Sequence, residues 1–357
     1  MAEKQLSAQE RAMLFSQATR ATFQTLGSMP VNNENSTVSF TLPKSRLLSK
    51  IWLEFEGEFV VKTDMSQVAQ KKNPLEIVRR ISVDLNNGFS PFILSGRDLH
   101  LYTLNRMNPV TFSSKGAYLN TKQVNWVDTR KTADGQVNKM RFMAQLPLTL
   151  NDRDAVGLVL LQNEETVVNV TIDVGQMSDC FQLNLQNKDE IIFKSLRVTP
   201  MLETFTIPPS PMAFPDLSVL KIVQAKEETF TENTMQTVKL NTGTIYRKMV
   251  LYFEDEHGVP IKDEEFLGNL ELVFNTADVP FSIKPSILSS KNAIETYSSQ
   301  IFEDGIFLLD FSNQGLPNLG GSRDYIDTER LTEFWLRFTC KKKGKVTVIS
   351  ETLSRLK

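Results

Sequence analysis

Hydrophobic and polar residues alternate along several short stretches of this chain, which is the pattern of half-buried β-strands. Residues 50–56 read KIWLEFE, and residues 248–254 read KMVLYFE. In each stretch every second residue is apolar, so one side of the predicted strand faces a core. A strand that recurs so far along the chain predicts two copies of one β domain.

Four further patterns recur in the same order. They are residues 37–40 with 237–240, residues 142–146 with 307–311, residues 168–174 with 334–340, and residues 198–205 with 346–353. The spacing between the paired stretches shrinks along the chain, which predicts shorter loops in the second copy. Five ordered matches therefore indicate a tandem duplication of a strand-rich domain.

The first thirty residues differ from the rest of the chain. Ser7 and Glu10 have the spacing of a capping box, which predicts the start of a helix. We expect this helix to run to about Leu26, because Gly27 supplies a stop signal and Pro30 follows it. Residues 1–30 are thus predicted to be a helical arm.

This helix would carry one narrow apolar stripe. The stripe consists of Ala12, Phe15, Thr19, Phe23 and Leu26. It would dock either on the arm's own domain or on a neighbouring subunit or lipid surface. The second alternative makes these five residues the candidate site of the chain.

Residues 31–208 are predicted to form the first β domain, interrupted by two short helices. Asn73-Pro74 starts the first helix and Ser95 with Asp98 the second, with a strand through Ile81 between them. Residues 155–161 form a compact apolar run, which predicts a buried strand.

Residues 209–230 are predicted to be a proline-rich linker that packs against a domain, because prolines disfavour both helix and inner strand. Residues 231–357 form the second β domain. Its KKKGK run at residues 341–345 predicts a hairpin turn that is either solvated or in contact with an acidic partner.

The composition is that of a soluble globular protein, with 41% hydrophobic and 23% charged residues. A net charge of −2 gives no basic surface for direct nucleic-acid binding. The sequence has no apolar run long enough to cross a membrane and no secretory signal at its start.

Candidate chemistry is sparse. His100 and His257 fall in different domains, and Cys180 with Cys340 matches neither a disulfide framework nor a metal-binding pattern. The acidic cluster at residues 263–265 lacks the ligand spacing of an EF-hand, and no nucleotide-binding loop is present. We expect no enzyme activity, no cofactor and no metal site.

These features predict an all-β protein with two tandem domains, each a jelly-roll barrel of eight strands or an immunoglobulin-like sandwich. An N-terminal helix and short helices in the loops would complete the fold. Three copies of such a duplicated chain would present six similar lobes around a threefold axis, a shape able to tile a shell.

The chain resembles the double jelly-roll major capsid proteins of tailless, membrane-containing bacteriophages (tectiviruses), and most of all those infecting Bacillus. The resemblance rests on residues 73–81, on the GRDLHL run at 96–101 and on QLPL at 145–148. The N-terminal helix, the prolines near residue 210 and the DTERL run at 327–331 are also similar.

This resemblance implies an eight-stranded jelly roll for each domain and a structural role in the virion, made in the host cytoplasm. Homotrimers would tile an icosahedral shell over an internal membrane, with the arm facing lipid and neighbouring trimers. Vertex and minor capsid proteins would be the other partners.

Two other functions stay open from the sequence. A two-domain carbohydrate-binding or adhesion protein would need a groove lined by aromatic side chains, for which Trp52, Tyr252 and Trp335 are the candidates. A glycan-cleaving enzyme would need a carboxylate pair in a cleft.

Overall fold

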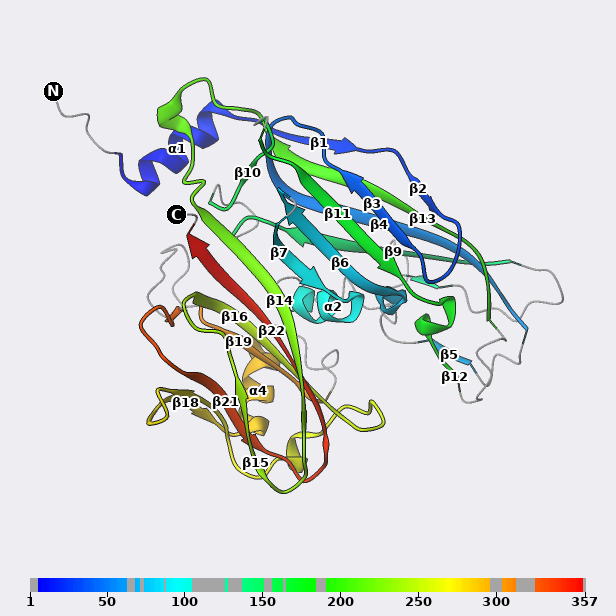
Figure 1. The fold of residues 1–357 in the computed structure, drawn as a ribbon, viewed down its shortest axis with the longest axis vertical. Helices are drawn as coiled ribbons and strands as arrows, with labels where there is room; N and C mark the ends of the chain where they lie inside the picture. The colour runs from blue at the N-terminus through cyan, green and yellow to red at the C-terminus, as the bar shows by residue number, and fades with distance from the viewer. Residues whose placement is uncertain are drawn as a thin grey trace. The chain divides into compact units, whose positions relative to one another are not determined.

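The computed structural model describes most of the chain. The described residues are 6–62, 68–70, 74–86, 88–104, 126–127, 137–150, 156–162, 165–183, 191–295, 304–312 and 325–355. Two compact units emerge. The first contains Met1–His100 and Thr111–Lys221, and the second contains Leu101–Val110 and Ile222–Ser354. Figure 1 shows that both are built mainly of strands.

The first unit contains two sheets with four principal strands each. One sheet has the order β1-β13-β4-β9 and the other β7-β6-β11-β3. The strands are β1 (Ala21–Thr25), β3 (Thr37–Thr41), β4 (Leu47–Val61), β6 (Val78–Leu85), β7 (Phe89–Leu94), β9 (Asn138–Pro147), β11 (Val168–Val174) and β13 (Ile191–Phe205). Labelled B to I in chain order, they give sheets BIDG and CHEF, the order of a jelly roll.

Shorter elements join these strands. They are β2 (Met29–Val31), β5 (Val68–Gln70), β8 (Trp126–Val127), β10 (Val159–Leu160), β12 (Phe181–Leu183), α2 (Gly96–Leu104) and the 3₁₀ turns η2 (Pro74–Ile77), η3 (Met177–Cys180) and η5 (Pro211–Ala213). The two short helices predicted near residues 74 and 96 are therefore present. The strand predicted at 155–161 is only two residues long, because Gly157 has a positive φ of 87° that ends the extended run.

The second unit repeats the same topology. Its sheets have the orders β14-β22-β16-β19 and β15-β21-β17-β18, which are again BIDG and CHEF. The strands are β14 (Val219–Phe230), β15 (Met235–Lys239), β16 (Ile245–Asp255), β17 (Leu270–Phe274), β18 (Asp278–Ile283), β19 (Ile306–Asp310), β21 (Phe334–Thr339) and β22 (Gly344–Arg355). The short pieces are β20 (Ile326–Asp327), η6 (Asp263–Glu265) and the helix α4 (Pro285–Glu295).

All five repeats found in the sequence fall on equivalent strands of the two jelly rolls. The KIWLEFE stretch lies on β4 and its partner KMVLYFE on β16, both strand D. Inward residues such as Phe55 and Phe253 are fully buried. The prediction of a tandem jelly-roll duplication is thus confirmed at the level of strand topology.

The equivalence extends to a β-bulge. On β4 the register against β13 shifts at Ser49, where Lys50 faces Glu203 and Leu48 faces Thr204. On β16 the register against β22 shifts in the same way at Arg247, between residues 246 and 248. A bulge re-aims the side chain of its extra residue, and in the second unit that residue is the buried Arg247.

The structure differs from the sequence-based predictions in one linker and one helix. The linker expected at 209–230 includes strand β14 from Val219 onward, because the prolines end at Pro215 and the residues after it alternate between the core and the surface. The helix α4 was not predicted. It lies in the F–G connection of the second jelly roll, where α2 lies in the first.

A partly buried ion pair between β16 and the end of β19 should make the stability of the fold depend on pH in the acid range. Lys248 Nζ lies 2.9 Å from Asp310 Oδ2. Burial alone raises the pKa of Asp310, but the Lys248 ammonium and hydrogen bonds from Ser312 outweigh it and hold that pKa below 3.8. The folded pKa is lower than the unfolded one, so this stabilisation is complete above pH 3.8 and is lost as the pH falls through the folded value.

We therefore expect Asp310→Asn to lower the free energy of unfolding by about 1–3 kcal/mol at pH 7. The difference from the unsubstituted chain should shrink as the pH falls below about 4. Urea unfolding at pH 7, 4 and 3 measures it, with exposed Asp278→Asn as the control. A difference that stays constant over this range would contradict the role of the ion pair.

Candidate assembly surface

The N-terminal arm begins as predicted and ends earlier. In α1 (Ala8–Ala18) the Ser7 side chain accepts from the Glu10 N–H, and Glu10 Oε2 accepts from the Ser7 N–H at 2.8 Å. The helix stops at Thr19, whose N–H and hydroxyl both donate to the Phe15 carbonyl. The prediction of a helix to Leu26 is wrong.

The chain after Thr19 joins the first jelly roll instead. Residues 21–25 form strand β1, which pairs antiparallel with residues 201–205 of β13. This stretch contains Thr22, Phe23 and Thr25, which favour strands. The edge of β13 offers backbone hydrogen-bond partners to residues 21–25. In a longer helix these residues would not pair with β13, so the helix ends before them.

The five stripe residues are therefore split between two elements. Phe15 is buried, with its ring centroid 5.3 Å from that of Phe205. Ala12 on the helix is exposed, and Thr19 after it is half-buried. Phe23 on β1 is 67% exposed, and Leu26 is half-buried. Phe15 thus anchors the arm to its own unit, whereas Ala12 and Phe23 face outward.

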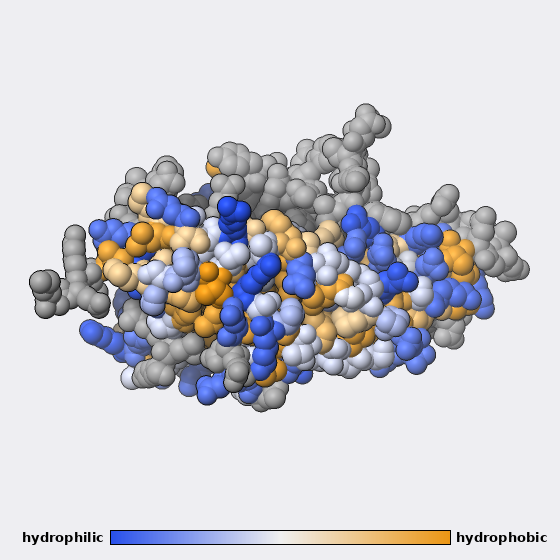
Figure 2. All heavy atoms as spheres, turned by 90° about the horizontal axis from the view of Figure 1, so that it is seen from above, coloured by the Kyte–Doolittle hydropathy of each residue, from blue (hydrophilic) through white to orange (hydrophobic). Residues whose placement is uncertain are grey.

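Three exposed apolar residues of this region were not singled out in the sequence. Met13 and Leu14 on α1 are 62% and 37% exposed, and Met212 on η5 is 55% exposed. Helix α1 packs against η5. Figure 2 shows hydrophobic and hydrophilic side chains interspersed over this face. Such a mixed surface is typical of a protein contact or a shallow lipid contact rather than a membrane-spanning element.

Within the part of the chain described above, no helix is both long and apolar enough to cross a bilayer. The same residues contain no group of three or more histidine, cysteine or acidic side chains placed to hold a metal ion. His257 is exposed at the surface, and both cysteines are buried thiols.

The lysine-rich turn of the second unit is paired with acidic side chains of its own unit. Lys345 Nζ lies 3.0 Å from Glu254 and 3.1 Å from Glu227. Lys342 pairs with Glu265 at 3.6 Å, and Lys343 pairs with Glu256. The predicted hairpin turn is present, and its charges are balanced locally.

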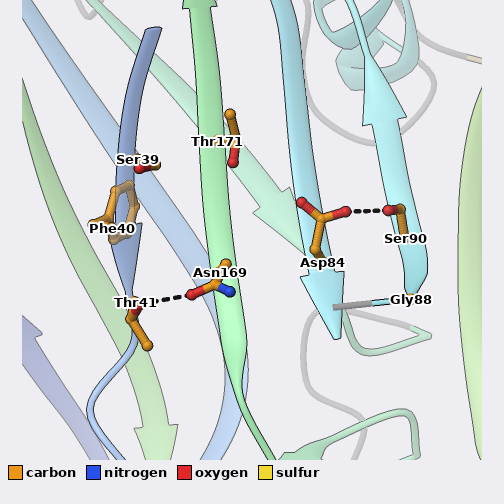
Figure 3. Close-up of a pocket in the computed structure, with 8 residues that line it drawn as sticks. All are labelled: Ser39, Phe40, Thr41, Asp84, Gly88, Ser90, Asn169 and Thr171. Atoms are coloured by element: carbon orange, nitrogen blue, oxygen red, sulfur yellow. Dashed lines mark hydrogen bonds between the residues drawn. The ribbon is translucent and has the colours of Figure 1, made fainter. Parts of the chain in front are cut away.

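The outer face of the first CHEF sheet is polar and hollowed. A hollow of about 710 Å³ is lined by Asp84, Ser90, Asn169 and neighbouring hydroxyls. Figure 3 shows Thr41 donating to Asn169, at 2.6 Å, and Ser90 to Asp84. These side chains bond to one another from strand to strand, as cross-strand pairs do.

The equivalent face of the second unit has different chemistry. In the second unit, Trp335 lies opposite Val273 on the neighbouring strand. This pair occupies the position that Asn169 and Asp84 occupy in the first unit. Trp335, Val273 and Arg337 line a smaller hollow of about 250 Å³. The other two aromatic candidates for a glycan groove lie on strand D of each unit, where Tyr252 is buried and Trp52 is half-buried with its indole N–H on Glu203 at 2.8 Å.

A fully buried ion pair lies in the second unit. Arg247 Nη1 lies 2.6 Å from Glu351 Oε1, and each side chain is 1% exposed. Tyr102 Oη donates to the same carboxylate, and Arg247 Nε donates to Tyr325 Oη at 3.0 Å. Burial lowers the pKa of Arg247, but Glu351 and the two tyrosines outweigh it and raise the pKa above its ordinary value.

No protein-family model matches the sequence, and no curated protein matches it significantly. Solved structures do match over nearly the whole chain. The STIV major capsid protein gives a TM-score of 0.66 at 12% identity, covering 94% of this chain and 97% of that one.

Two further structures show the same likeness. The capsid of PBCV-1 virus gives a TM-score of 0.65 at 10% identity, over 94% of this chain and 93% of that one. The major capsid protein P2 of bacteriophage PM2 gives 0.55 at 11% identity, over 95% and 98%. With the BIDG and CHEF sheets of both units, these likenesses show that the chain has the double jelly-roll fold found in viral major capsid proteins.

Proposed function

We propose that this chain is the structural major capsid protein of a virus. The observation that carries the proposal is the duplicated jelly roll, matched from end to end by capsid proteins of STIV, PBCV-1 and PM2. Three copies form a homotrimer with six similar lobes, and trimers tile an icosahedral shell over an internal membrane. The tectivirus type, with a Bacillus host, is the specific form that the sequence resemblance supports.

The work of this protein is assembly rather than catalysis. Within the trimer, stability comes from buried area, which exceeds about 2,000 Å² in many obligate interfaces. The exposed apolar residues of the arm provide the contact to neighbouring trimers or to lipid. Vertex and minor capsid proteins complete the shell, and the net charge of −2 supports a shell without direct nucleic-acid binding.

Light scattering on the purified chain tests the trimer. We expect the mass of three copies, unchanged by dilution, and closed particles by electron microscopy under assembly conditions. A strict monomer at high concentration, without particles, would contradict the capsid function.

The arm makes a second, separable prediction. Replacing Met13 and Leu14 by Asp should leave a folded trimer, because both side chains are exposed and Phe15 still anchors the helix. Particle yield should fall by more than about tenfold, since a loss of about 1.4 kcal/mol already weakens one contact tenfold. Electron microscopy and sedimentation measure the yield.

Met235→Asp is the matched control, because Met235 is equally exposed, at 63%, but lies in the second unit. Normal particles from the arm variant would overturn the assignment of the arm. Removal of all residues up to Leu26 is a poorer test, because it also deletes strand β1 and its pairing with β13.

Carbohydrate binding is the second candidate function, favoured by the polar hollow around Asp84 and Asn169. Carboxylate, amide and hydroxyl groups are the partners that sugar hydroxyls need. A glycan array tests it. Specific binding that is lost on Asp84→Ala, in a chain that stays monomeric, would favour this function over the capsid.

A further inference from the structure

Each jelly roll has a helix between its strands F and G, and the two helices can be aligned by their first hydrogen bonds. Ser95 precedes α2, and its carbonyl accepts from the Leu99 N–H. Lys284 precedes α4, and its carbonyl accepts from the Leu288 N–H. This alignment makes Leu99 equivalent to Leu288. Figure 1 labels both helices.

The inner faces of the two helices agree with the alignment. Leu99 and Leu288 are 0% and 1% exposed. One turn later, Thr103 and Asn292 are both buried polar residues, at 6% and 4%. Asn292 exchanges two hydrogen bonds of 2.8 Å with the backbone of Leu308 on strand G. The two helices thus bury equivalent faces.

The outer faces differ sharply in exposure. In α2 the outer residues Asp98, Leu101 and Tyr102 are 6%, 4% and 1% exposed. The outer face of α4 instead displays Ile287 at 57% and Ile294 at 73% exposure. Residues seven apart lie on one side of a helix, so the two isoleucines share one exposed face with Ser290 and Lys291 between them.

The buried outer residues of α2 make their contacts within the second unit. Residues 101–104 of α2 cluster with that unit, and Tyr102 Oη donates to Glu351 on its strand I. The neighbouring outward residues of the same sheet, Val250 and Ile349, are each 1% exposed. In the second unit, the outer face of strands D and I is therefore buried around Glu351.

The matching face of the first unit is left open. By strand register, Glu203 on β13 is equivalent to Glu351, because it faces Lys50 as Glu351 faces Lys248. Trp52 and Met201 occupy the places of Val250 and Ile349, and both are only half-buried. The side chain of Glu203 itself is 23% exposed.

The geometry points to a contact between copies of this chain: the outer face of α4 in one copy docks on the face around Trp52, Met201 and Glu203 in the next. This contact repeats between copies the cover that residues 101–104 give to strands D and I of the second unit. Lys291, which pairs with Glu295 at 2.7 Å within α4, takes the place of Tyr102 in the alignment and brings a positive charge toward Glu203. The contact is heterologous, and the proposed trimer requires that its rotation close after three copies.

This inference rests on the proposed trimer and names the two surfaces that hold it together. Replacing Ile287 and Ile294 by Asp tests it, with the mass measured by light scattering over a dilution series. Burying one isoleucine contributes about tenfold or more to association. We expect the dissociation constant of the trimer to rise by at least about a hundredfold.

Val259→Asp is the matched control, because Val259 is 53% exposed in the same unit but lies outside α4. Thermal unfolding of the diluted proteins checks that the variants fold. If the unsubstituted chain is a trimer and the α4 variant is an equally stable trimer, this contact is overturned and the capsid proposal stays intact. A monomeric unsubstituted chain would overturn the capsid proposal itself.

Cross-linking identifies the occupant. One sample carries only Ile287→Cys and a second only Met201→Cys; the two native cysteines are buried. After the samples are mixed and reassembled, a short thiol cross-linker should join the two kinds of chain to each other. Chains carrying both substitutions should give covalent trimers. Links only between identical single-cysteine chains would overturn the head-to-tail contact.

Discussion

Glu351→Leu should lower the free energy of unfolding by about 3–5 kcal/mol, the loss expected when one partner of a buried ion pair is removed. Arg247 would remain 1% exposed, with its positive charge facing an apolar side chain. The hydrogen bond from Arg247 to the Tyr325 hydroxyl, and the Tyr325 ring 5.4 Å from the guanidinium, replace only part of that attraction. Urea unfolding with linear extrapolation measures the change.

The double variant Arg247→Met with Glu351→Leu separates the pair from the individual charges. Because it removes both buried charges, it should recover most of the lost stability. The control is Glu228→Ala, which breaks an exposed pair with Lys226 and should change stability by no more than about 1 kcal/mol. A loss below about 1 kcal/mol for Glu351→Leu alone would show that the pair contributes little.

The second large effect is expected at the centre of the second jelly roll. Phe253→Ala should lower the free energy of unfolding by about 3–5 kcal/mol, because it leaves a cavity among packed rings. The Phe253 ring centroid lies 4.9 Å from that of Phe338, 5.0 Å from Phe266 and 5.7 Å from Phe307, all nearly edge-to-face. Edge-to-face ring pairs stabilise the fold beyond the effect of burying their apolar area.

Phe23→Ala is the control for a phenylalanine that buries little, since Phe23 is 67% exposed. It should change stability by less than about 0.5 kcal/mol. Phe253→Leu should lie between the two, because it keeps most of the volume. Equal melting of Phe253→Ala and the unsubstituted chain would show that this cluster does not hold the second core together.

The duplication and the strands of both jelly rolls were predictable from the sequence. Alternation along a strand is a local pattern, and residues 50–56 and 248–254 carry it without reference to the rest of the chain. The capping box at Ser7 and Glu10 is equally local, because both hydrogen bonds span three residues. The α4 helix had a local signal too, since Pro285 lies at its first position.

The end of the arm helix depended on tertiary structure. Residues 19–25 can continue a helix or join a strand, and the open edge of β13 decides between them. The candidate stripe assumes one continuous helix through Leu26. Helix α1 ends at Ala18, so Phe15 and Phe23 lie on different elements. The packing of Phe15 against Phe205 fixes the rotation of helix α1 about its axis. That rotation leaves Met13 and Leu14 exposed.

Local residue patterns specify a doubled β protein with a capped N-terminal helix, because those features are set by neighbouring residues. Which charges are buried and which apolar faces stay exposed depends instead on how the strands and helices pack. Arg247 meets Glu351 across two strands, and Ile287 stays exposed while Leu288 beside it is buried. Such outcomes depend on long-range contacts, which a periodic pattern does not record.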